Sequence, residues 1–72
     1  MYINSSDKKY HQMNDFIRGE MRRKKITQKT VADRLNIDQS QIARRLSGEV
    51  EWLAREIIIV YELLGIEKDW RN

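Results

Sequence analysis

Few side chains in this chain have the types and spacing that catalysis or metal binding would need. The sequence has one histidine, His11, and no cysteine, so a thiolate metal site and a disulfide framework are both excluded. Asp33 and Asp38 lack the ligand spacing of a calcium loop. A glycine-rich phosphate loop is also missing from the sequence. The sequence therefore predicts a protein that is not an enzyme and that uses no metal and no cofactor.

The remaining chemistry is that of amides and guanidinium groups, and positive charge is concentrated in the middle of the chain. The net charge is +3 and the isoelectric point about 9.5. Residues 18–45 contain nine Lys and Arg against three acids, whereas residues 46–72 contain three against six. The middle of the chain could therefore contact a polyanion. Solvation of helices by lysine and arginine explains the same pattern equally well.

The elements that must position these groups are helices within one domain spanning residues 1–72. The chain has no proline, three glycines and no alternating apolar pattern long enough for strands. Apolar spacing predicts helices from about residue 6 or 7 to 25, over 28–35 and 39–47, and from about 51 to 64. In the first helix the stripe contains Tyr10, Met13, Ile17 and Met21, with Phe16 widening it. Residues 1–6 are expected to be flexible, and residues 66–72 to add a helical turn that docks Trp70 on the core.

Turn and cap residues mark the helix ends. Thr27 is the expected N-cap of the second helix, and Asn36 tolerates the left-handed backbone of the next turn. Asp38 is the expected N-cap of the third helix, where Gln41 would complete a capping box. The glycines at positions 48 and 65 suit the ends of the last two helices.

The segment from Thr27 to Gly48 has the pattern of a helix-turn-helix. Ala32 is small where two helices would cross closely, and the three-residue connection 36–38 would hold them at a steep angle. The chain from about residue 16 to 66 resembles the lambda-repressor-like helix-turn-helix family, which includes phage repressors and Cro proteins. The matching positions are Ile26-Thr27-Gln28, Val31-Ala32, Leu35, Gln39-Ser40, Ile42, Leu46-Ser47-Gly48 and Leu63-Leu64-Gly65-Ile66.

The resemblance implies an all-α domain of four or five helices whose third helix lies in the major groove of DNA. The family's base-reading positions fall on Gln39, Ser40 and Arg44, with Gln41 nearby. Gln suits the adenine edge and Arg the guanine edge. Capping or solvation is the alternative role of Gln39 and Gln41. The phosphate-contacting glutamine of the family matches Gln28, and the additional phosphate contacts expected nearby are Lys29, Arg22, Lys24 and Lys25. A solvated helix end explains the run of charges from Arg22 to Lys25 equally well.

Three positions depart from the family pattern. Met21 and Leu46 stand where many members pair an arginine with a glutamate, so an apolar contact is expected there. Arg45 stands where an apolar residue often completes the core, so a second arginine is expected to be free at the surface. The turn has Asn36 in place of the usual glycine. The first two departures suggest a diverged branch whose docking surface need not be the family's standard one.

The resemblance and the size of the chain imply a Cro-like, phage-type transcriptional regulator of a lysis/lysogeny switch that binds double-stranded operator DNA. The alternative is an anti-repressor that inactivates or remodels a partner phage repressor by direct contact. Successive residues turn by about 100° on a helix, so residues 57–60 cannot all face inward. Ile58 or Ile59 is therefore expected to be exposed, or to lie under a helical turn that contains Trp70 or under a partner. Together with Arg45, these two residues are the candidate protein interface, for a repressor or in a homodimer.

The sequence also predicts the location of the protein in the cell. The longest apolar run, residues 57–61, is too short to span a bilayer, so no membrane contact is expected. Residues 1–9 are polar and do not resemble a signal peptide. The expected location is the cytoplasm of a bacterial host cell.

Overall fold

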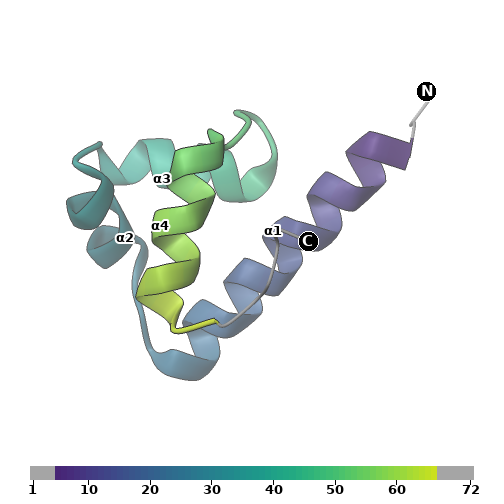
Figure 1. The fold of residues 1–72 in the computed structure, drawn as a ribbon. Helices are drawn as coiled ribbons and strands as arrows, with labels where there is room; N and C mark the ends of the chain where they lie inside the picture. Colours follow the sequence, from purple (N-terminus) through teal and green to yellow (C-terminus); the bar gives the residue numbers. More distant parts are fainter. Residues whose placement is uncertain (1–4, 67–72) are drawn as a thin grey trace.

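The computed structural model describes residues 5–66, with side chains described from residue 11 onward (Figure 1). This part of the chain folds into four α-helices and contains no strand: α1 Ser5–Lys24, α2 Gln28–Leu35, α3 Gln39–Ser47 and α4 Ala54–Leu64. The predicted all-α class is confirmed, and the predicted bounds of α2 and α3 match. The predicted docking of Trp70 falls outside the described residues.

Three left-handed residues end helices where the sequence indicates. Asn36 follows α2 with φ 60°, Gly48 follows α3 with φ 88°, and Gly65 follows α4 with φ 68°. Each returns its backbone N–H to carbonyl groups of the helix that it ends. At the start of α2 the Thr27 hydroxyl accepts a hydrogen bond from the Thr30 N–H at 3.1 Å, so the predicted N-cap is confirmed.

The predicted capping box at the start of α3 is wrong. Asp38 has the extended backbone of an N-cap, but its side chain makes no capping hydrogen bond. Only its backbone carbonyl accepts from the Gln41 N–H, at 3.0 Å. The Gln41 side chain is instead engaged by Arg45 one turn later, so it cannot reach back to the cap.

The predicted start of α4 near Glu51 is also wrong, because the helix begins at Ala54. The preceding Leu53 is extended, with ψ 150°, and its N–H donates to the Glu56 carboxylate at 2.9 Å. This is the half of a capping box that a glutamate at the third helical position provides. The Trp52 side chain enters the core from this extended segment and is only 8 % exposed.

The core lies where the four helices meet and draws on each of them. Met21 of α1 and Leu46 of α3 both belong to it, as the expected apolar replacement of a polar pair requires. Phe16 departs from its expected place in the buried stripe: it is 42 % exposed and packs a tilted ring on Tyr61, with centroids 6.1 Å apart. The buried apolar residues are Ile17, Met21, Val31, Ala32, Ile42, Leu46, Trp52, Val60, Tyr61 and Leu64.

The arrangement leaves α3 at the surface. In Figure 1, α3 passes behind the upper end of α4, α2 lies on one side of α4, and α1 runs diagonally on the other side with its N-terminal half extending away. None of the described helices is both long and apolar enough to cross a bilayer.

Candidate nucleic-acid interface

One side of α3 is buried and the other faces solvent. Ile42 and Leu46 are at most 3 % exposed and anchor the helix in the core. The opposite side is defined here as the outward face of α3, and its exposed residues are Gln39, Ser40, Ala43, Arg44 and Ser47. These positions recur at steps of three and four residues, so they form one continuous stripe along the helix. The predicted base-reading residues Gln39, Ser40 and Arg44 all lie on it.

Arg44 is the one cation on the outward face. Its side chain is 54 % exposed, and its Nε atom lies 3.6 Å from the carboxylate of Glu49, which is 63 % exposed. An exposed pair at this distance contributes about 0–1 kcal/mol. The guanidinium group can therefore exchange this partner for another acceptor at little cost.

The start of α2 holds two predicted phosphate contacts. Gln28 is the first residue of the helix and is half-buried. Lys29 follows it and pairs with Asp33 at 3.0 Å, with side chains 72 % and 67 % exposed. The backbone N–H groups of a helix start attract anions, and an exposed lysine pair is weak, so both residues could contact a phosphate.

The three predicted phosphate contacts at the end of α1 are not brought together with the outward face of α3. Figure 1 has the C-terminal end of α1 at the bottom of the molecule and α3 at the top. Arg22 and Lys25 are exposed there. Lys24 is half-buried, pairs with Glu20 at 3.2 Å and donates to the backbone carbonyl of Leu64. The lysine thus binds the C-terminal end of α4, where positive charge is favourable.

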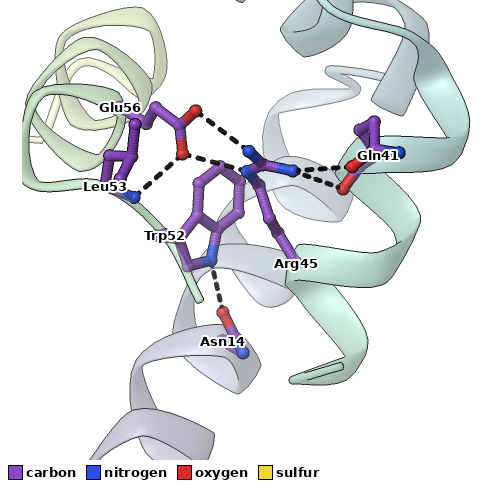
Figure 2. A network of polar contacts seen from close by, with 6 residues as sticks. All are labelled: Asn14, Gln41, Arg45, Trp52, Leu53 and Glu56. Carbon is purple, nitrogen blue, oxygen red and sulfur yellow. Dashed lines mark hydrogen bonds and ion pairs between the residues drawn. The ribbon is translucent and has the colours of Figure 1, made fainter. Parts of the chain in front are cut away.

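Arg45 is not the free surface arginine that the sequence suggests. Its side chain is 12 % exposed and makes two hydrogen bonds to the Glu56 carboxylate, at 2.9 and 3.2 Å (Figure 2). The third nitrogen of the guanidinium group donates to the backbone and side-chain oxygens of Gln41, at 3.2 and 3.3 Å. The planar fork of arginine suits this bidentate contact. Arg45 therefore joins α3 to α4, and it keeps the amide of Gln41 turned toward α4.

The Glu56 carboxylate is the centre of this network. It is 4 % exposed and accepts from Arg45 and from the Leu53 backbone at once. Its burial alone would raise the pKa, but the hydrogen bonds from Arg45 and Leu53, with the charges of Arg45 and Arg55, outweigh burial and lower the pKa from 4.5. The carboxylate therefore stays ionised at neutral pH and holds α3 and the start of α4 together.

Two further contacts fix the framework around α3. The Trp52 indole N–H donates to the side-chain oxygen of Asn14 at 2.7 Å, and Asn14 is 1 % exposed (Figure 2). The guanidinium group of Arg18 donates to the backbone carbonyl of Leu46, near the end of α3. Through these contacts α1 supports both α3 and the segment that leads into α4.

Asn14, Arg18 and Glu56 are structural polar groups that were not predicted from the sequence. Asn14 lies between Met13 and Ile17 in the apolar stripe of α1, which is a signal for a buried polar side chain. Glu56 has the third-position spacing of a capping box from Leu53. Each of the three also has a partner on another element, namely Trp52, Leu46 and Arg45, and local spacing alone does not reveal these contacts.

The predicted protein-interface residues lie on α4, apart from Arg45. Ile58 is 38 % exposed and Ile59 is half-buried. Thus one of the four consecutive apolar residues 57–60 does face solvent, as helix geometry requires. Comparison of the chain with protein-family models, with curated proteins and with solved structures found no match.

Proposed function

We propose that this protein is a helix-turn-helix transcriptional regulator that binds double-stranded operator DNA through α3, in the manner of the Cro-like regulators of phage lysis/lysogeny switches. The observation that carries the proposal is the outward face of α3. A nine-residue helix presents a stripe of amide, hydroxyl, methyl and guanidinium groups to solvent while its other side is fixed in the core. A surface helix of this size fits the major groove.

The side chains on this face divide into two roles. Arg44 suits the O6 and N7 atoms of guanine, Gln39 suits adenine, and the Ser40 hydroxyl suits either kind of edge. Gln28 and Lys29 at the start of α2 contact phosphates and set the register of the protein on the duplex. Gln41 is removed from the base-reading set, because Arg45 holds its side chain. Arg22, Lys24 and Lys25 have no direct phosphate role in this arrangement.

The test begins with selection from a random pool of duplex DNA, because it needs no knowledge of the operator. The expected result is enrichment of a short shared sequence that contains a guanine. Binding of the selected duplex should weaken steeply with salt, since phosphate contacts release counterions. A pool that shows no shared sequence after repeated rounds, with the protein folded, would contradict the proposal.

A matched pair of variants then separates base reading from general charge. Arg44→Ala and Arg23→Ala each remove one exposed arginine, but Arg23 lies at the end of α1 and pairs with Glu20. Loss of a bidentate base contact removes about 1–3 kcal/mol of discrimination, so Arg44→Ala should weaken binding of the selected duplex roughly tenfold. Arg23→Ala should leave sequence preference unchanged. Equal losses in the two variants would reject Arg44 as a base reader.

A second candidate function, an anti-repressor that acts by direct contact with a partner phage repressor, is favoured by a different observation. Among residues 11–66, three large apolar side chains are exposed: Phe16 at 42 %, Leu53 at 51 % and Ile58 at 38 %. Exposed apolar surface of this kind often marks a protein interface. The two candidates differ in what Arg44→Ala does.

The distinguishing assay adds the protein to a repressor already bound to its operator. A DNA-binding regulator competes for the duplex, and Arg44→Ala raises the protein concentration needed for this competition about tenfold. An anti-repressor removes or reshapes the repressor complex without binding the duplex itself, and Phe16→Ser rather than Arg44→Ala abolishes the effect.

A further inference from the structure

The ion pair between Arg44 and Glu49 occupies only one side of the Arg44 guanidinium group. Its Nε atom is the nitrogen that lies 3.6 Å from the Glu49 carboxylate. The neighbouring Arg45 differs, because its Nε and both terminal nitrogens all donate to Glu56 or Gln41. Neither terminal nitrogen of Arg44 makes a hydrogen bond with a residue between positions 11 and 66. The end of the guanidinium group, where these two nitrogens lie side by side, therefore remains available while Nε stays paired.

The backbone also fixes Glu49 beside Arg44. α3 ends at Gly48, whose left-handed backbone turns the chain back toward the helix. The Glu49 N–H then donates to the Arg44 carbonyl at 2.9 Å and to the Ser47 hydroxyl at 3.3 Å. Arg44 and Glu49 are thus joined by a main-chain hydrogen bond as well as by their side chains. The carboxylate therefore starts from a fixed point at the C-terminal end of the outward face of α3.

We propose that Glu49 is a positioning residue that orients Arg44 for a guanine in the major groove. In this arrangement the carboxylate holds Nε, and the two terminal nitrogens donate to the O6 and N7 atoms of one guanine. Two parallel donors match this pair of acceptors. The inference rests on the proposed DNA binding by α3, and it adds the residue that prepares the guanine reader.

The pair is weak in the free protein and strengthens in the complex. Arg44 and Glu49 are both exposed, so water screens their attraction. A duplex against the outward face of α3 displaces this water, and the attraction between the two charges increases as the local dielectric constant falls. An arginine that is already held also loses less side-chain freedom when it binds a base. Both effects increase the preference for guanine.

The charge of Glu49 has a second effect of opposite sign. A carboxylate at the edge of the outward face repels the phosphates of any duplex, whatever its sequence. Removal of the carboxylate should therefore strengthen binding to unrelated DNA and weaken the preference for guanine. A residue that only supported the fold would not produce this combination, because loss of folded protein weakens binding to every duplex.

The test compares the selected duplex with the same duplex carrying 7-deazaguanine, which lacks the N7 acceptor. The guanine to be replaced is the one whose recognition Arg44→Ala removes. The wild-type protein should bind the guanine duplex about tenfold more tightly than the 7-deazaguanine duplex. Glu49→Ala should reduce this ratio about threefold or more, because Arg44 is no longer held. Glu49→Gln should retain most of the ratio, because its amide oxygen still accepts from Nε.

Two matched variants show whether Glu49 acts through Arg44. Asp33→Ala also removes an exposed carboxylate beside an exposed cation, Lys29, and should leave the guanine ratio unchanged. In the Arg44→Ala background, the further change Glu49→Ala should also leave the ratio unchanged, because the reader is already absent. Circular dichroism shows whether each variant is folded.

The outcomes separate the role of Glu49 from the proposed function. If the wild-type protein selects no shared sequence, DNA reading by α3 fails and the role of Glu49 fails with it. If the protein selects a sequence but Arg44→Ala removes recognition of no guanine, or Glu49→Ala keeps the full ratio, only the role of Glu49 is overturned. An effect of Glu49→Ala that is equally large without Arg44 also overturns it.

Discussion

Two consecutive arginines on α3 have opposite environments. Arg45 is 12 % exposed and makes a bidentate contact with a carboxylate that is itself 4 % exposed. Arg44 is 54 % exposed and lies 3.6 Å from a carboxylate that is 63 % exposed. One step along a helix turns the side chain by about 100°, which is enough to move it from an interior contact to solvent. The comparison shows that positive charge on α3 serves two purposes: one arginine fixes the helix and the other is available to a ligand.

The largest expected effect comes from removing the interior carboxylate. Glu56→Ala leaves the Arg45 guanidinium buried without its partner and the Leu53 N–H without its acceptor, and should lower the free energy of unfolding by about 3–5 kcal/mol. Glu49→Ala removes the partner of Arg44 and should change the free energy of unfolding by less than about 1 kcal/mol. Urea titration of both variants measures the difference. Equal losses would show that the two arginines do not differ as described.

The loss of stability in acid should depend on protonation of the same carboxylate, that of Glu56. The pKa of Glu56 is lowered in the folded protein, so the unfolded chain takes up a proton more readily. The contribution of Glu56 is complete above its unfolded pKa and is lost as pH falls through the folded pKa, below about 4.5. Thermal unfolding between pH 3 and 7 should therefore show a shallower acid decline for Glu56→Gln than for wild type. An identical decline would assign the acid sensitivity to other carboxyl groups.

A smaller net effect is expected when both partners of the interior pair are replaced. Arg45→Met/Glu56→Leu removes two buried charges together, and such exchanges are often neutral or stabilising. The double variant should be more stable than Glu56→Ala by at least about 2 kcal/mol, in the same urea titration. Its DNA binding then tests what the pair does for α3. Undiminished sequence preference would show that apolar packing orients the helix as well as the ion pair does.

The smallest expected effect on stability is that of the outward arginine. Arg44→Ala removes an exposed side chain from a weak pair, so the free energy of unfolding should change by less than about 0.5 kcal/mol. A loss above about 1 kcal/mol would mean that Arg44 holds the fold, and a change in DNA affinity could no longer be assigned to a lost base contact.

The parts of the fold that depend on neighbours in sequence could be predicted. Thr27, Asn36 and the glycines at 48 and 65 act on the backbone within a few residues, and the bounds of α2 and α3 followed from them. The true start of α4 depends on a Glu56 side chain that also binds Arg45, eleven residues earlier. The periodic apolar pattern extends back through Trp52, so it gives no sign that the helix begins only at Ala54.

The same distinction separates the candidate site residues. The family resemblance predicted Gln39, Ser40 and Arg44 as a set, and the three residues do share the exposed side of α3. Lys24 and Arg45 are each engaged in the structure by a partner on another element, and Gln41 is engaged through Arg45. Lys24, for example, binds a carbonyl forty residues later. Long-range pairing decides which polar groups remain available, and it must be read from the fold.

Contact between DNA and the outward face of α3 is tested most directly by a titration of the backbone amide resonances with the selected duplex. The expected result is that the largest shifts occur at Gln39, Ser40, Ala43 and Arg44, with smaller ones at Gln28 and Lys29, while the amides of α4 from Arg55 to Glu62 change little. Shifts concentrated around Phe16, Leu53 and Ile58, with α3 unchanged, would contradict the account.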